Sequence, residues 1–330
     1  MRNQKSEWCA TIITIIILAV IFLLACSFFA PAPPKTAHVI PMKNSLTFKA
    51  LGEAVPWGVT RVEAPLIHQQ NKGRGVKIAI LDTGIDLDHP DLRVAGNVTF
   101  VPNTENGDDD NGHGTMVAGI IAALDNGEGI VGIAPEAEIY SVKVLNRNRA
   151  GTVNAVIKGI EWSIENKMQI INMSFGTNSD LPPALVQALN KAYQAGIILI
   201  SGAGNSGDLG NIHSPARYEQ VIAVGATDES DTRAIFSCAG DDLELMAPGT
   251  NVLTTAMGGG YTAGIGTSFA VPHVTGTAAL LIAAGVNDHK TIRHILARTA
   301  KDLGETGKDS WYGYGLVHAD EAMRAISMPD

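Results

Sequence analysis

An aspartate, a histidine and a serine each stand beside glycine in this sequence, where an apolar run ends or a helical pattern begins. Asp82 closes an apolar run before Thr-Gly, His113 lies between two glycines at the start of a helical pattern, and Ser268 follows Gly-Thr at the start of another. Taken singly, each is explained as a turn residue or a helix cap. Together they provide a nucleophile, a base and a group that orients the base, the set that hydrolyses acyl compounds through a covalent intermediate.

The motifs around these three residues resemble those of the subtilisin-like serine proteases, the subtilases, and occur in the same order along the chain. The resemblance runs from Glu53 to the end of the chain without large insertions. Met116 stands where a second histidine is common, and Phe269 stands where methionine is usual. Neither position supplies a reacting group, so we expect activity to survive both differences.

The resemblance implies a serine endopeptidase that works through an acyl-enzyme. Ser268 attacks the peptide carbonyl, His113 accepts and later returns the proton, and Asp82 holds the imidazole in the required tautomer. Asn205, in a glycine-rich turn after an apolar run, matches the residue that donates its amide to the oxyanion together with the backbone N–H of the serine. A left-handed turn residue is the plainer explanation of Asn205.

The same resemblance indicates where a peptide would bind. Residues 170–176 would be an edge strand that pairs with extended substrate, and residues 145–151 would be the second substrate-flanking strand on the other side. The pocket walls would be Leu145, Ser174, Phe175, Gly176, Gly202, Ala203 and Gly204. Arg147 and Arg149 also lie in the flanking segment, where a solvated loop explains them at least as well as a specificity role. We expect broad cleavage, with tolerance for acidic residues upstream of the cut.

A structural Ca²⁺ is also implied. Asp91 matches a calcium-binding carboxylate of the family, Glu53 falls where a glutamine ligand is frequent, and residues 124–130 have the length of the family's calcium loop. The predicted ligands are the side chains of Glu53, Asp91 and Asn126 and the backbone carbonyls of Leu124, Glu128 and Ile130. These reach the six oxygens that calcium requires. An ordinary acidic surface loop would not explain the acids at positions 53 and 91.

The elements that would position these residues alternate between strand and helix. Short β-branched runs predict strands at 76–81, 139–145, 170–173, 197–200 and 221–224. Helical patterns cover 113–123, 153–165, 183–195, 268–284 and 289–299. This alternation predicts an α/β fold, a doubly wound and mostly parallel sheet with helices on both faces. Functional sites of such sheets form at the carboxyl ends of strands, where Asp82 falls.

The N-terminus carries an apolar run, from Ala10 to Ala25 with Phe28, Phe29 and Ala30 beyond it, behind a basic head. Its length approaches the roughly 20 residues that span a bilayer, and the head predicts a cytoplasmic N-terminus. We therefore expect a transmembrane signal-anchor in residues 1–30, a membrane partner, and a catalytic domain on the extracytoplasmic side. A lipoprotein modified at Cys26 and a secreted, cleaved form are the two alternatives.

Residues 31–52 are rich in proline and predict a tether, and we expect residues 53–330 to form the catalytic domain. Family members usually carry a folded pro-domain, but only 26 residues separate Cys26 from Glu53, too few for an independent fold. We expect the domain to fold without one and to be a monomer.

The amino-acid composition excludes some of the remaining classes of partner and function. The 33 acidic residues outnumber the 24 basic ones and no basic run occurs, so nucleic acid is not an expected partner, whereas protein and peptide substrates are. Of the three cysteines only Cys238 lies in the predicted domain, which therefore has no internal disulfide and no expected cysteine-based metal site. The alternative function is a catalytically silent surface module that binds peptides. An esterase would require a different motif around its serine and the chain order Ser, Asp, His.

Overall fold

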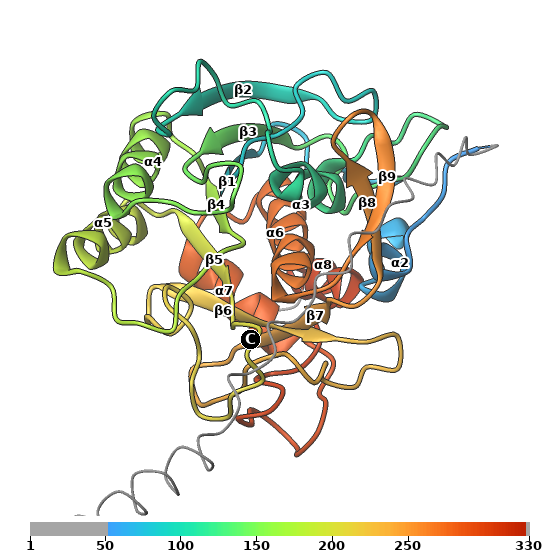
Figure 1. The fold of residues 1–330 in the computed structure, drawn as a ribbon. Helices are drawn as coiled ribbons and strands as arrows, with labels where there is room; N and C mark the ends of the chain where they lie inside the picture. Colours follow the sequence, from blue (N-terminus) through green and yellow to red (C-terminus); the bar gives the residue numbers. More distant parts are fainter. Residues whose placement is uncertain (1–51, 328–330) are drawn as a thin grey trace, which may run out of the picture. The chain divides into compact units, whose positions relative to one another are not determined.

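The computed structural model describes residues 52–327, which form a seven-stranded sheet covered by helices (Figure 1). All strand pairs in this sheet are parallel, and the strands lie in the order β2-β3-β1-β4-β5-β6-β7. Their bounds are β1 Lys77–Asp82, β2 Val94–Thr99, β3 Glu138–Lys143, β4 Ile170–Met173, β5 Ile198–Gly202, β6 Val221–Thr227 and β7 Leu245–Pro248.

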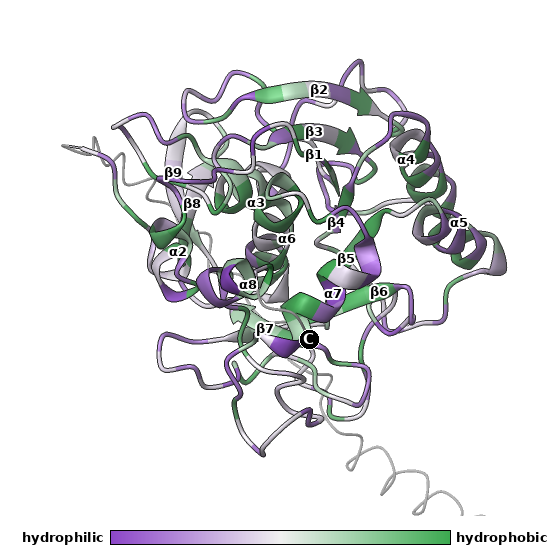
Figure 2. Ribbon diagram, turned by 180° about the vertical axis from the view of Figure 1, so that it is seen from behind, coloured by the Kyte–Doolittle hydropathy of each residue, from purple (hydrophilic) through white to green (hydrophobic). Residues whose placement is uncertain are grey.

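Side chains alternate between the two faces of the sheet, as strands that are buried on both sides require. In β1, Ile78 and Ile80 belong to the core that packs against α3, α6, α7 and α8, whereas Ala79 and Leu81 belong to the core against α4 and α5. The helices are α3 His113–Ala122, α4 Val153–Glu165, α5 Pro183–Gln194, α6 Thr267–Ala283, α7 His289–Arg298 and α8 Ala319–Ala325. This confirms the predicted doubly wound α/β fold (Figures 1 and 2).

Several elements were not predicted from the sequence. They are the helix α2 (Trp57–Arg61), the 3₁₀ turn η1 (Ala64–Leu66), the strands β2 and β7, the helix α8, and the antiparallel hairpin of β8 (Val252–Ala256) and β9 (Gly260–Gly264). One prediction about the position of a strand in the sheet was wrong. β4 is not an edge strand, because it lies in the middle of the sheet between β1 and β5.

Helix α6 runs through the larger core and is buried almost all round, so its sequence shows no polar face. In the part of the chain from 52 to 327, no helix combines the length and the hydropathy needed to cross a membrane. The predicted anchor at 1–30 lies outside the described residues.

Candidate active site

Asp82 and His113 form a buried pair. Asp82 ends β1 at the carboxyl edge of the sheet and His113 begins α3, with 0% and 5% of their surfaces exposed. His113 Nδ1 lies 2.8 Å and 3.0 Å from the two carboxylate oxygens of Asp82. A carboxylate can only accept, so Nδ1 carries the proton and Nε2 is left as an acceptor. Among the described residues Nε2 has no hydrogen-bond partner although it is buried, so it is free to take a proton.

Asp109 holds the start of α3 in place, and the sequence analysis did not identify it. Its Oδ1 accepts from the backbone N–H of Asn111 and Gly112 and from the Thr83 hydroxyl, and its Oδ2 accepts from both N–H and hydroxyl of Thr115. The negative charge of a carboxylate at a helix N-terminus also interacts favourably with the positive end of the helix dipole. The run of three aspartates just before the histidine motif was the available signal.

Ser268 lies at the second position of α6, and Gly266, not Ser268, is the N-cap residue. Ser268 therefore does not cap this helix, and the explanation of this serine as a helix cap is wrong. Ser268 is 7% exposed, and its neighbour Phe269 packs against the His113 ring with a centroid separation of 5.6 Å. The start of α6 thus lies against the imidazole of His113.

Ser268 and Ser174 exchange hydrogen bonds. Ser268 Oγ donates to the carbonyl of Ser174 at 2.9 Å, and Ser174 Oγ donates to the carbonyl of Ser268 at 3.0 Å. The second bond has a clear cause, because Pro272 lies four residues after Ser268 and has no N–H to complete the helical bond. In this structure Ser268 Oγ therefore bonds to a carbonyl and not to His113. A turn about χ1 changes the partner of such a hydroxyl, and catalytic hydrogen bonds often tighten only when substrate binds.

Asn205 follows β5 and is oriented by the residue before the serine. Its Oδ1 accepts from the backbone N–H of Thr267 at 2.8 Å and from the Thr267 hydroxyl at 3.0 Å. The amide nitrogen then points away from these donors and has no partner among residues 52–327. Backbone N–H groups of the first helical turn, that of Ser268 included, also lack helical partners. Asn205, Thr267 and Ser268 thus line one cavity at the positive end of α6.

A cavity of about 610 Å³ opens at this point. It is lined by Leu145, Asn148, Arg149, Ser174, Phe175, Gly176, Gly202, Gly204, Asn205, Ser206, His213, Thr267 and Ser268. All predicted pocket residues except Ala203 are among them. Ala203 is fully buried and packs in a separate core cluster instead. Ser206, His213 and Thr267 are cavity residues that were not predicted from the sequence, and Asn148 was included only as part of the flanking segment 145–151.

Glycine is required at two of the wall positions. A Cβ on Gly202 would lie 2.8 Å from Thr267 Oγ1, and a Cβ on Gly204 would lie 2.5 Å from the His213 ring. Gly204 also has φ +114°, a conformation that residues with side chains rarely adopt. The loop that carries Asn205 therefore lies tightly against both α6 and the cavity wall.

The second flanking segment forms a turn rather than a strand. Leu145 pairs with Gly151 in an isolated antiparallel bridge, and Arg149 has φ 61° at the turn. Both arginines are exposed, but only Arg149 lines the cavity. The carbonyl of Arg147 accepts from the Asn111 side chain. A neighbouring apolar cavity of about 200 Å³ shares Leu145, Arg149, Phe175 and Gly176 with the first.

The predicted calcium ligands lie around one loop. Glu53 Oε1 accepts from the backbone N–H of Asn126 and Gly127, and Asp91 Oδ2 accepts from that of Ile130. Asn126 Oδ1 accepts from the N–H of Glu128 at 2.9 Å. The segment before the loop is tied to it, since Ala54 N–H donates to the carbonyl of Gly129.

Asp91 carries the strongest indication of a cation. It is 2% exposed, and its Oδ1 has no hydrogen-bond partner among the described residues. Burial raises the pKa of Asp91 despite the hydrogen bonds to Oδ2. Tyr261 donates to Asp91 Oδ2 at 3.1 Å. Burial, as the larger cause, and the negative charge of Asp91, as the second, raise the pKa of Tyr261 to about 12. A buried carboxylate oxygen without a donor fits a bound cation, so the residues fit a calcium ion.

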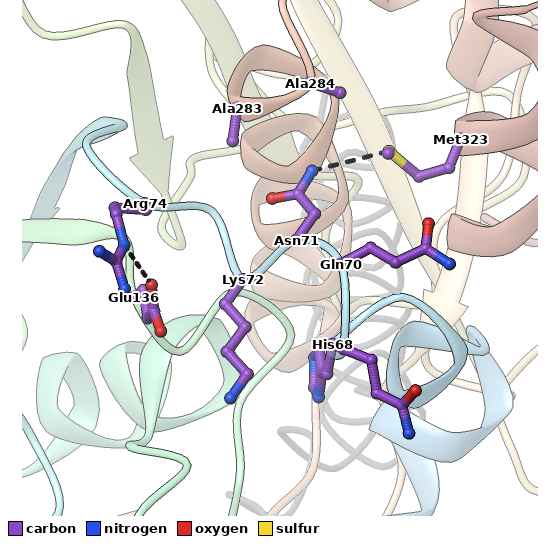
Figure 3. Close-up of a pocket in the computed structure, with 10 residues that line it drawn as sticks. His68, Gln70, Asn71, Lys72, Arg74, Glu136, Ala283, Ala284 and Met323 are labelled. Atoms are coloured by element: carbon purple, nitrogen blue, oxygen red, sulfur yellow. Dashed lines mark hydrogen bonds and ion pairs between the residues drawn. The ribbon is translucent and has the colours of Figure 1, made fainter.

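Another cavity, of about 650 Å³, contains none of these residues (Figure 3). Arg74 and Glu136 form an ion pair at its edge, and the Asn71 side chain lies near the sulfur of Met323. Its ten lining residues include no serine, threonine or cysteine, so this cavity offers no hydroxyl or thiol nucleophile beside His68.

Comparisons with known proteins identify the family of this chain. Residues 73–315 match the family described as the subtilase family, Peptidase S8. The chain is 46% identical over 275 residues to Subtilisin Savinase of Lederbergia lenta. This alignment covers 82% of this chain and 100% of that protein. The chain is 46% identical over 277 residues to an alkaline protease of Shouchella clausii, covering 83% and 71% of the two chains. It is 44% identical over 275 residues to Subtilisin DY of Bacillus licheniformis, covering 82% and 99%.

Proposed function

Because this chain belongs to the subtilase family and is a serine-type endopeptidase, we propose that Asp82, His113 and Ser268 are its catalytic triad. The observation that supports the assignment most directly is the buried Asp82–His113 pair, whose Nε2 is unpartnered. The start of α6, with Ser268, packs against this imidazole through Phe269.

In the proposed mechanism each step uses groups already in place. Substrate binding turns Ser268 Oγ from the Ser174 carbonyl to His113 Nε2, which takes the hydroxyl proton as oxygen attacks the peptide carbonyl. Asp82 stabilises the imidazolium that results. The Asn205 amide and the N–H of Ser268 stabilise the oxyanion of the tetrahedral intermediate. His113 then protonates the leaving amine, and water repeats the sequence on the acyl-enzyme.

The substrate is an extended peptide. It would lie between the segment that follows β4, Ser174 to Gly176, and the turn between Leu145 and Gly151, which frame the cavity of about 610 Å³. Backbone and small side chains make most of these walls, so shape rather than charge selects the residue before the cut, and specificity is broad. Arg149 is the exception, because its guanidinium favours acidic residues upstream.

We also propose that Ca²⁺ stabilises the fold at the loop 124–130. Asp91, Glu53 and Asn126 would hold the ion with the carbonyls of Leu124, Glu128 and Ile130. The ion supplies no chemistry to the reaction, and its role is to neutralise the buried carboxylate of Asp91.

Residues 1–30 are proposed to tether the enzyme to the cell membrane, with the catalytic domain outside the cytoplasm. The support is their apolar run behind a basic head. Membrane fractionation followed by N-terminal sequencing distinguishes the tether from its alternatives. An intact Met1 in the membrane fraction supports it, an N-terminus at Cys26 indicates a lipoprotein, and a soluble shortened chain indicates secretion.

Peptide hydrolysis by purified protein tests the proposed triad. Wild-type protein should release fragments from casein, whereas Ser268→Ala and Asp82→Asn should lose activity by several orders of magnitude while keeping their melting temperatures within a few degrees. A folded wild-type protein that binds peptides without cutting them would instead support the alternative, a catalytically silent surface module. Activity retained in Ser268→Ala would refute the assignment.

A further inference from the structure

Three potential metal ligands that have no part in the triad meet beside the substrate cavity. They are Asp208 and His213, in the loop that follows Asn205, and Cys238, a buried free thiol. One carboxylate oxygen, one imidazole nitrogen and the sulfur all lie within 4.8 Å of one another. Sequence alone did not suggest this set, because Cys238 is 25 or more residues from the other two and is the only cysteine among the described residues.

The backbone fixes the positions of all three. His213 N–H donates to the carbonyl of Ala203 at 2.8 Å, and Cys238 N–H donates to that of Gly204 at 3.0 Å. The carbonyl of Asp208 accepts from the N–H of Ala239 at 3.1 Å. The loop with Asp208 and His213 is thus bound on both sides to the segment with Cys238. The fold therefore brings the backbone positions of these three residues together.

Ser206 marks the point at which the three groups converge. Its hydroxyl oxygen lies 2.5 Å from Asp208 Oδ2, 3.1 Å from His213 Nε2 and 3.2 Å from Cys238 Sγ. This hydroxyl can donate its one proton to Asp208 and accept from the imidazole and the thiol, so it bridges all three groups. A cation that took the place of this hydroxyl would bind the three groups directly.

We propose that Asp208, His213 and Cys238 bind a zinc ion. Thiolate, imidazole and carboxylate together are the donor set typical of zinc, and three protein ligands leave a fourth position to water. Zinc bonds of about 2.0–2.3 Å in a tetrahedral site put ligand atoms about 3.4–3.8 Å apart, so the side chains must close by about 1 Å. Binding releases the thiol proton of Cys238 to solvent, and thiolate and carboxylate neutralise the ion.

Zinc at this position would inhibit the peptidase. His213 and Ser206 line the same cavity as Ser268, and Ser206 directly follows Asn205. The ion would draw His213 and the Ser206 loop together, which shifts the Asn205 amide and narrows the pocket. This consequence rests on the proposed function, whereas zinc binding itself does not.

Cobalt binding tests the site without using activity. The probe is Co²⁺ added to full-length Ser268→Ala protein, in which self-digestion is absent, and the readout is the near-ultraviolet thiolate-to-cobalt absorption. We expect a signal that Zn²⁺ displaces, that Cys238→Ser and Cys238→Ala abolish, and that Asp208→Asn shifts to at least about tenfold higher cobalt concentration. The double variant Cys9→Ser/Cys26→Ser is the matched control and should keep it. No thiolate absorption, or absorption that survives both Cys238 variants in folded protein, would overturn the proposal.

Inhibition is measured in parallel on active protein with excess Ca²⁺ present. Wild-type activity should fall with micromolar Zn²⁺ and return when a zinc-selective chelator is added. The inhibitory concentration should rise at least about tenfold in Cys238→Ser, a buried residue that does not line the cavity. Equal inhibition of both proteins would show that zinc acts elsewhere, for example on His113, and would contradict the inhibitory role even if cobalt binds at Cys238.

Discussion

Removing calcium should lower the melting temperature by about 5 °C, and the structure explains why. Asp91 is buried with one oxygen unpartnered, so its charge is costly until a cation neutralises it. At 100 times the dissociation constant, an ion that binds only the folded state adds about 2.7 kcal/mol. The unfolding entropy of a domain of roughly 280 residues is about 0.6 kcal/mol/K, which converts this stabilisation to about 5 °C.

The assay is thermal unfolding of the Ser268→Ala protein with saturating calcium and after chelation. Asp91→Asn keeps an acceptor for Ile130 N–H and Tyr261 but loses the charge, so its calcium shift should vanish. Its melting temperature after chelation should not fall below that of the parent, because the amide removes a buried charge. Asp125→Asn is the matched control in the same loop, since Asp125 pairs with Lys72 at 2.6 Å, and it should keep the shift. Equal shifts in the Asp91→Asn variant and its parent would refute the site.

Three further outcomes are expected. Asn205→Ala should lower kcat by about two to three orders of magnitude with little change in KM, the loss known for removal of an oxyanion donor in subtilisin, and steady-state kinetics measures it. His273 is fully buried, and burial lowers its pKa to about 4, so protons bind preferentially to the unfolded chain between pH 6.5 and 4. Unfolding free energy should therefore fall by about 3 kcal/mol on acidification through that window, and denaturant titrations should show no such contribution in His273→Asn. Arg149→Ala should reduce the preference for acidic over neutral upstream residues by up to about fivefold in peptide-library profiling, and an unchanged ratio would remove Arg149 from specificity.

The central strands and most helices could be predicted because each has a local pattern. The apolar run before Asp82 and the helical pattern after His113 are visible without any partner element. β2 escaped prediction because it is half-exposed and contains glycine and asparagine, and β7 because it is short and ends in Pro248. The place of β4 in the sheet depends on which crossovers follow, so its residues alone could not show that it is central.

The candidate site divides in the same way. Asp82, His113, Ser268 and Asn205 each lie at an element boundary that the sequence marks with glycine. The tertiary contacts around these residues have no comparable signal in the sequence. The exchange of hydrogen bonds between Ser174 and Ser268 spans 94 residues, and the approach of Cys238 to His213 depends on how two loops pack. These are tertiary effects, which no local pattern encodes.

Reaction with a fluorophosphonate tests the central claim most directly, because only an activated serine hydroxyl attacks the phosphorus. Wild-type protein should gain one adduct, peptide mass mapping should place it on Ser268, and His113→Ala should abolish it while melting near the wild-type temperature. Ser174, which bonds reciprocally to Ser268, is the internal control and should stay unmodified. A folded wild-type protein that does not react, or an adduct on any other serine, would contradict the assignment of Ser268 as the nucleophile.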